Sequence, residues 1–276
     1  MNLNFCNSMN NKNWQKQRQK SFYINMRRYH NYIKSGLYDT YTNNINNLLE
    51  ICVGSSGDLN KWISNKIKNV VGYDINSVSI KEGERRVKDI KGYTPNISLS
   101  VKDLSIDVLA GNQEFDVVSC MFALHYFFKT EQTFNTIIES ITNNLKNGGI
   151  FMATLFDGDS VINRLNYPFN DQEHFHIEQI NKTDPSQDKT CFGLDTLFGN
   201  TINVSIKDTT LNNSMNYNPN IEYIVNYMGF VNLMKSKGFD LVESRMFNTY
   251  DHTKFKLNKT NKDISFLNRM YIFVKL

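Results

Sequence analysis

Between residues 48 and 155, short apolar runs alternate with stretches whose apolar residues recur at helical intervals. Short runs bounded by Gly, Asn, Asp or Ser predict strands, and the stretches between them predict helices. We expect Ser77 or Ser79 to cap the helix that follows the second strand. The alternation predicts a mostly parallel sheet with helices on both faces, an α/β fold. The predicted strands are 48–53, 70–73, 97–101, 115–120 and 150–155, and the predicted helices are 22–39, 58–68, 77–90 and 131–145.

The pattern changes after Phe156. Residues 157–220 are polar and irregular apart from a strand-like stretch at 201–206, which predicts an insertion that covers the site as a lid. Residues 223–237 have helical spacing, and 239–244 and 270–276 predict two final strands. We expect one domain over residues 22–276, preceded by a flexible, basic, Asn-rich leader over 1–21.

The first strand–loop–helix–strand unit has the pattern of a nucleoside site. A Gly/Ser loop, Gly54–Gly57, follows the first strand, and the second strand ends on Asp74. A loop glycine lets a ligand approach the backbone, and the carboxylate can accept hydrogen bonds from ribose hydroxyls. Cys52 and the missing third glycine break the dinucleotide pattern, which favours a nucleoside without a pyrophosphate; S-adenosylmethionine is the commonest ligand of that type. A simple helix cap is the alternative role for Asp74.

Further polar residues follow other predicted strands, at the edge where ligands bind in such sheets. They are Asp103, the pair His125–Tyr126 and the Asp-Gly-Asp sequence at 157–159. Taken alone, the His-Tyr pair is more typical of packing than of a binding pocket. His174 and His176 lie in a polar segment without a credible fourth metal ligand, even with Cys191, so we expect no metal site.

Composition changes this picture little. The chain has 276 residues, 40% hydrophobic and 21% charged, which fits a globular protein with a real core. The net charge of +4 is modest, but the leader gathers lysines and arginines and is either a solvated arm or a segment that faces a polyanion. No apolar run suggests a membrane helix or a signal peptide, and the four cysteines form no C-x-x-C. We therefore expect an intracellular protein.

Several motifs, in order, resemble those of mRNA cap (guanine-N7) methyltransferases. FDVVSCMFALHYFF at 115–128 is similar to that family's FD-x-x-S-x-Q-F-x-x-HY-x-F signature, and LLEICVGSSGDLNKW at 48–62 to its D-x-G-C-G-x-G-G-DL-x-K-W loop. MRRYHNYIKS, GYDINSVSI, LKNGGIFMATLFDGDSVINRL, FGNTINVSIKD and IEYIVNY resemble further family segments. The resemblance covers roughly residues 22–276. The DGD form is most similar to capping enzymes of poxviruses and other large DNA viruses.

The resemblance implies a class I, Rossmann-like, S-adenosylmethionine-dependent methyltransferase that methylates N7 of the guanosine cap. Lys34 and Glu50 would lie by the methionine end of the cofactor, above the Gly54 loop. Asp74 would hold the ribose and Asp103 the adenine amino group. Cofactor-binding residues would be Lys34, Glu50, Gly54, Asp74, Asp103 and Met121.

For the cap, the resemblance implies that Glu222 accepts hydrogen bonds from the N1 and N2 edge of guanine and that Arg86 faces the triphosphate. Without that resemblance, the sequence around Glu222 is typical of the start of an ordinary amphipathic helix. Cap-binding residues would be Asn31, Arg86, Phe122, His125, Tyr126, Phe156, Glu222 and Tyr271. Guanine N7 already carries a lone pair, so proximity and orientation can drive the transfer without a general base. Glu222 and Tyr126 would act catalytically by favouring the cationic product.

The chain departs from the family pattern at five positions. Cys52 replaces the first loop glycine, Glu50 an aspartate, His30 an asparagine, Met121 a glutamine and Ser55 a lysine. We expect these changes to act on cofactor affinity.

Two alternatives stay open: a related methyltransferase acting on another nucleobase, and an inactive or weakly active cap-binding or partner subunit. The expected partner is the capped 5′ end of mRNA, and we expect no association with a membrane. Triphosphatase and guanylyltransferase domains of a larger capping enzyme, or a stimulatory subunit, are further possible partners. The expected location is cytoplasmic (host cytoplasm or virion if the protein is viral), and nuclear if it is cellular.

Overall fold

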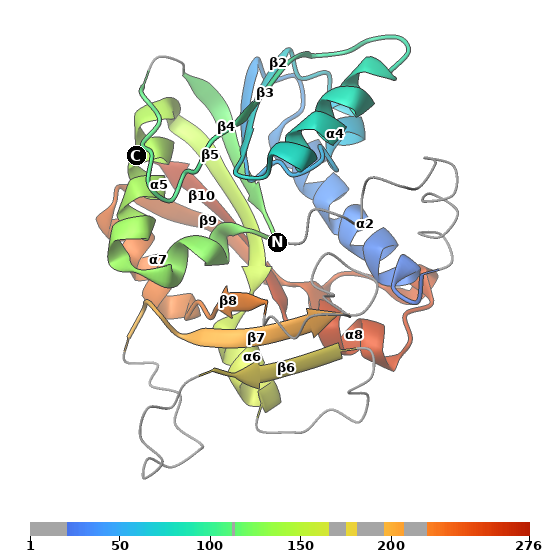
Figure 1. Cartoon of the computed structure of the whole chain (residues 1–276), viewed down its shortest axis with the longest axis vertical. Helices are drawn as coiled ribbons and strands as arrows, with labels where there is room; N and C mark the ends of the chain where they lie inside the picture. Colours follow the sequence, from blue (N-terminus) through green and yellow to red (C-terminus); the bar gives the residue numbers. More distant parts are fainter. Residues whose placement is uncertain (1–20, 112–113, 166–174, 181–195, 207–219) are drawn as a thin grey trace.

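The computed structural model describes residues 21–111, 114–165, 175–180, 196–206 and 220–276. A seven-stranded sheet with the order β3-β2-β1-β4-β5-β10-β9 forms its centre, and a separate three-stranded sheet has the order β6-β7-β8. Figure 1 shows the small sheet lying across one end of the large one. The leader at 1–20 lies outside the described residues.

The first five strands of the large sheet are parallel, as the sequence predicts. They are β1 (Asn47–Ile51), β2 (Asn69–Asp74), β3 (Asn96–Val101), β4 (Phe115–Met121) and β5 (Leu145–Phe156). The two final strands, β9 (Phe239–Met246) and β10 (Asn268–Lys275), are also confirmed, and β10 pairs antiparallel with both β5 and β9.

Helices cover both faces of this sheet. On one face, α2 (Ile24–Tyr41), α3 (Leu59–Ser64) and α4 (Ser77–Lys88) pack around buried side chains such as Trp62 and Leu48. On the other, α5 (Glu131–Asn144) and α7 (Tyr227–Ser236) pack around residues such as Phe134 and Phe230. The short 3₁₀ helix η1 (Leu124–Lys129) follows β4. Burial of aromatic and aliphatic side chains on both faces is the main source of stability of such a layered fold.

Several predicted boundaries were wrong. The side chain of Asn76, rather than that of Ser77 or Ser79, caps α4 by accepting from the amides of Val78 and Ser79. The predicted helix at 58–68 ends at Ser64. The helix predicted from residue 223 begins at Tyr227, because 221–223 pair with β7 as a strand and Asn226 then caps the helix.

The predicted irregular insertion contains regular structure. It holds α6 (Gly158–Leu165), β6 (Phe175–Gln179) and β7 (Thr201–Ile206), and β8 (Ile221–Tyr223) completes their sheet. Side chains from α6, β6, β7 and the start of α2 form a core of their own, which includes Val161, Val204 and Met26. At the C-terminal side, η2 (Phe247–Thr249), η3 (Thr253–Phe255) and α8 (Lys259–Ser265) connect β9 to β10.

Candidate active site

The predicted cofactor residues gather at one edge of the large sheet. Gly54, Asp74 and Asp103 stand at or just after the carboxyl ends of β1, β2 and β3, which are hydrogen-bonded neighbours, and Met121 ends the adjacent β4. The parallel register therefore brings these residues together, as expected for a ligand site in this type of sheet.

The loop after β1 is tightly folded and tied to Asp74. Cys52, Gly54 and Ser56 all have positive φ, at 56°, 54° and 55°. The Gly54 amide donates to one Asp74 carboxylate oxygen at 2.8 Å, and the Asn76 amide donates to the other at 2.8 Å. Asp74 thus organises the loop, and each oxygen keeps a further lone pair for a ligand.

Below this loop, Glu50 lies in a buried hydrogen-bonded network. The Tyr38 hydroxyl and the Trp62 indole both donate to its Oε1, the latter at 2.9 Å, and Tyr38 Oη lies 3.1 Å from Ser119 Oγ. Burial raises the pKa of Glu50 to about 8, and the neighbouring charge of Asp58 adds to this effect. Burial outweighs the nearby charge of Lys34, so Glu50 is largely protonated near neutral pH.

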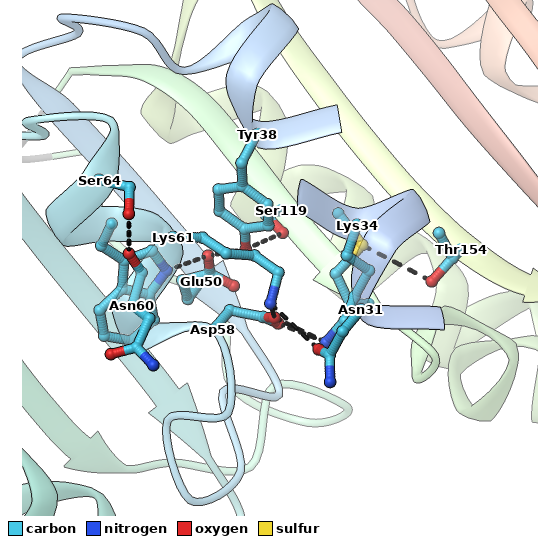
Figure 2. Close-up of polar contacts among 12 residues, drawn as sticks. Asn31, Lys34, Tyr38, Glu50, Asp58, Asn60, Lys61, Ser64, Ser119 and Thr154 are labelled. Carbon is cyan, nitrogen blue, oxygen red and sulfur yellow. Dashed lines mark hydrogen bonds and ion pairs between the residues drawn. The ribbon is translucent and has the colours of Figure 1, made fainter. Parts of the chain in front are cut away.

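A second polar cluster joins α2 to the start of α3. Asp58 Oδ1 lies 2.6 Å from Lys34 Nζ and 2.7 Å from Lys61 Nζ, and Lys61 also donates to Asn31 Oδ1 at 3.1 Å. Figure 2 shows these side chains meeting beside Glu50 and Tyr38. Burial opposes the ionisation of Asp58, but the two ammonium groups outweigh it and lower its pKa. Sequence reasoning assigned no role to Asp58, although it belongs to the quoted DL-x-K-W motif.

The adenine end of the predicted cofactor site is simpler. Asp103 Oδ1 accepts from the amide and the hydroxyl of Ser105 at 2.9 and 2.6 Å. Asp103 is partly exposed, as is Met121, whose sulfur accepts from Thr154 Oγ1 at 3.6 Å. Asp103 thus shapes a turn while presenting a carboxylate at the sheet edge.

Phe122 lies between the predicted cofactor residue Met121 and the predicted cap residues on η1. Its φ is 57°, and its amide donates to the carbonyl of Thr154 at 2.7 Å. This conformation turns the ring out of the strand, where it stacks on His30 with centroids 5.2 Å apart. His30 replaces an asparagine of the family pattern, and burial lowers its pKa to about 3, so it is a neutral ring here.

Four predicted cap residues lie on η1, β8 and β10. β8 contacts η1, which brings Glu222 Oε2 to 3.4 Å from His125 Nε2. Burial raises the pKa of Glu222 to about 8 and lowers that of His125 to about 3, so both are neutral near pH 7. The His125 ring lies 4.2 Å from that of Tyr126, which is 42% exposed.

Three buried polar atoms in this region lack a hydrogen-bond partner among the described residues. They are both ring nitrogens of His125 and the hydroxyl of Tyr271, which is fully buried between Tyr227 and Phe230. Buried polar atoms are rarely left unpaired, because each one costs roughly 1–3 kcal/mol. The unpartnered ring nitrogens of His125 lie beside the buried carboxylic acid of Glu222, an arrangement expected where a polar ligand completes the pairing.

Two predicted cap residues have intramolecular contacts that say little about a ligand. Arg86 pairs with Glu82 on its own helix, Nε to Oε1 at 2.9 Å. Phe156 packs against the core of the small sheet, just before Asp157, which binds Arg269 at 2.6 Å. Their roles at the cap stay predictions.

Among the described residues, no group of three His, Cys, Asp or Glu side chains could hold a metal ion. His174 and Cys191 lie outside them. No described helix is long and apolar enough to cross a membrane.

The fold is that of known methyltransferases. A crystal structure of the PH0226 protein from Pyrococcus horikoshii OT3 matches with a TM-score of 0.60 at 15% identity, covering 94% of this chain and 99% of that one. A putative S-adenosylmethionine-dependent methyltransferase from Listeria monocytogenes matches with a TM-score of 0.57 at 15% identity, over 90% of this chain and 97% of the other. The expected Rossmann-like methyltransferase fold is confirmed.

Sequence relatives are more specific. The mRNA cap guanine-N(7) methyltransferase of Caenorhabditis elegans is 35% identical over 160 residues, which are 52% of this chain and 42% of that protein. That of Eremothecium gossypii is 28% identical over 239 residues, covering 82% of this chain and 54% of the relative. A probable mRNA-capping enzyme of Acanthamoeba polyphaga mimivirus is 27% identical over 280 residues, 85% of this chain and 23% of the viral protein.

The chain thus spans about half the length, or less, of these curated relatives. A family model described as the mRNA (guanine-N(7))-methyltransferase domain matches residues 3–272. The predicted resemblance is confirmed: with nearly its whole length matched by this model, the chain belongs to the mRNA (guanine-N(7))-methyltransferase domain family.

Proposed function

We propose that this chain transfers a methyl group from S-adenosylmethionine to N7 of the guanosine cap of mRNA. The family and its named relatives support the activity. The observation that carries the proposal is the buried pair Glu222 and His125, whose side chains lie 3.4 Å apart where β8 meets η1 and in which both ring nitrogens of His125 lack a hydrogen-bond partner among the described residues.

The residues at that edge fit S-adenosylmethionine. Asp74 would accept from the ribose hydroxyls and Asp103 from the adenine amino group, each with lone pairs that the chain leaves unused. Lys34 would meet the carboxylate of the methionine end and Glu50 its positive charge. When bound, the cofactor supplies an electrophilic methyl group on sulfonium. Glu50 favours that cation by ionising as it binds, because a nearby positive charge lowers a carboxyl pKa.

Guanine fits the second half of the site. Its N1–H and N2–H₂ donors match an acceptor carboxylate, which Glu222 becomes when ionised. The base becomes cationic as N7 is methylated, so an ionised Glu222 and the exposed ring of Tyr126 stabilise the product side more than the substrate side. No proton leaves N7, so the chain needs no general base, and orientation in the crevice supplies the acceleration.

The wider setting is proposed on the relatives alone. The mimivirus relative is named a probable mRNA-capping enzyme, and this chain matches 23% of it. We propose that triphosphatase and guanylyltransferase activities, from flanking domains or other proteins, precede this step, with or without a stimulatory subunit. The chain would act where transcripts are capped: in the cytoplasm in a viral setting, in the nucleus in a cellular one.

The test is methyl transfer from labelled cofactor to GpppG-capped RNA, with the same RNA carrying an N7-methylated cap as the control. We expect label on the first RNA and none on the second. Equal labelling of both would point to another acceptor atom. No transfer, with no calorimetric cofactor binding at millimolar concentration, would favour the inactive-subunit alternative. If Glu222→Ala abolishes transfer to the cap but not to other acceptors, methylation of another nucleobase as the main activity is excluded.

A further inference from the structure

A basic and aromatic surface lies on the outer side of α2, next to the site. We call it the α2–η3 face and define it by Arg28, Tyr32, Lys254 and Lys256. All four side chains are exposed, and Lys254 Nζ lies 4.1 Å above the centre of the Tyr32 ring. Neither the cofactor half nor the guanine half of the site uses these residues.

The face is held in place by contacts between α2 and the segment around η3. The side-chain amide of Asn25 donates to the carbonyl of Lys256 at 3.3 Å, and the Tyr32 ring lies 5.2 Å from that of Phe255. The Tyr29 hydroxyl donates to the carbonyl of Phe247 and lies 3.3 Å from that of Tyr250. Residues three and four apart share one side of a helix, so Arg28 stands on the stripe that runs from Asn25 to Tyr32.

The helix that carries this stripe also borders the site through another of its sides. The ring of Phe247, on η2, contacts His30 and Phe122 with centroids 5.4 and 5.9 Å apart. Asn31 follows His30 on the same helix and contacts the lysine cluster around Asp58. The helix α2 thus contacts both the residues around Phe122 and the segment around η3, and Figure 1 shows α8 beside α2.

The charge of the face is positive. Two carboxylates lie nearby: that of Asp251, which interacts with Lys254, and that of Glu243, which lies 4.0 Å from Arg245. Asp251 Oδ1 accepts from the amide and the hydroxyl of Thr253, and Glu243 accepts from the hydroxyl of Tyr41. A further cation, Arg245, lies 4.3 Å over the Tyr250 ring. Cations beside exposed aromatic rings match single-stranded nucleic acid, because phosphates bind the cations and unpaired bases stack on the rings.

We propose that the α2–η3 face binds the first nucleotides of the transcript body downstream of the cap. Arg28, Lys254 and Lys256 meet phosphates, and Lys254 swings from the Tyr32 ring to a phosphate, which frees the ring to stack on an unpaired base. This inference rests on the proposed cap methylation, because it assigns the part of the same substrate that lies outside the guanine pocket.

The experiment compares two substrates with one protein. Methyl transfer is measured on the GpppG dinucleotide and on a capped, unstructured RNA of about 20 nucleotides, at low and moderate salt. The double variant Arg28→Glu/Lys254→Glu should raise KM for the long RNA by about tenfold and reduce the salt dependence. The log–log slope should fall by about 0.7 for each phosphate that the variant no longer neutralises. KM and kcat for GpppG should stay unchanged.

Two further variants sharpen the result. Tyr32→Ala should raise KM for the long RNA only, since it removes the stacking ring. The double variant Lys88→Glu/Lys91→Glu is the matched control, because it makes the same charge change on two exposed lysines, at the end of α4 and in the segment before β3. If the double variant Arg28→Glu/Lys254→Glu binds long RNA as tightly as the unmodified chain, the proposal is overturned. An acidic protein surface would then be the partner that fits the α2–η3 face. No transfer to GpppG by the unmodified chain refutes the proposed function instead.

Discussion

Replacing Glu222 by glutamine separates two roles of its carboxyl group. Burial raises the pKa of Glu222 from 4.5 to about 8, so the folded chain keeps this side chain protonated at pH values where the unfolded chain ionises it. The contribution of Glu222 to stability is therefore complete below about pH 4.5 and is lost as the pH rises toward 8. Glutamine has nearly the same shape and does not titrate, so it lacks this pH-dependent loss.

The size of the effect follows from the difference between the two pKa values. Linkage predicts that Glu222 costs the fold roughly 3 kcal/mol between about pH 5 and pH 8, because the slope reaches about 1.4 kcal/mol for each pH unit only midway between the two pKa values and falls toward each of them. The Gln variant should thus be nearly as stable as the unmodified chain near pH 5 and roughly 3 kcal/mol more stable near pH 8. Its methyl transfer to the cap should fall by about 10²–10³-fold, because the cationic base loses its counter-charge.

Urea denaturation at the two pH values measures the first effect, and initial rates on GpppG-capped RNA measure the second. Glu139→Gln is the matched control, because it neutralises an exposed glutamate on α5. A Glu222→Gln variant whose stability follows the same pH profile as the unmodified chain would refute the burial argument. Unchanged transfer rates would refute the catalytic one.

Three further predictions concern the cofactor half. Cofactor binding near pH 7 should release close to one proton, because Glu50 ionises as the cofactor binds. Calorimetry in buffers of different ionisation enthalpy measures this release. No release would mean that Glu50 is already charged. Asp58→Asn leaves the ammonium groups of Lys34 and Lys61 facing each other without a carboxylate, so the free energy of unfolding should fall by about 3–5 kcal/mol. The control Asp89→Asn removes an exposed ion pair and should cost less than about 1 kcal/mol. Equal losses in urea denaturation would contradict this prediction. Cys52 has a left-handed backbone φ of 56°, a conformation that glycine adopts without strain, so Cys52→Gly should change the free energy of unfolding by no more than about 1 kcal/mol. Loss of the thiol side chain should also let the cofactor bind more tightly. Weaker cofactor binding in a titration would show that the thiol contributes to binding.

The parallel half of the fold was predictable because each strand is a short apolar run closed by polar residues or glycine. The boundaries were harder. The cap of α4 is Asn76, one residue before Ser77 and three before Ser79. Both residue types cap helices, and hydrophobic periodicity does not distinguish between the three positions. β8 has three residues, too few for an alternating pattern, and its partner β7 lies in a segment that looked irregular. Glu222 therefore looked like part of a helix until strand pairing placed it over η1.

The site was predictable where spacing reflects topology. Gly54, Asp74 and Asp103 follow neighbouring parallel strands, so their order in sequence becomes proximity in space. The charge cluster around Asp58 was not predictable from the sequence, because it depends on how α2 lies against α3. Nor could the sequence show that burial makes Glu50 and Glu222 neutral, because a pKa depends on the surroundings of a group in three dimensions.

The central claim is that the methyl group reaches N7 of the cap guanine. The most direct measurement is to label GpppG-capped RNA with this chain and isotopic S-adenosylmethionine, cleave the triphosphate bridge, and identify the labelled nucleotide. The account predicts that all label is in 7-methylguanosine monophosphate. Label in any other nucleoside, or no label with cofactor bound, would contradict it.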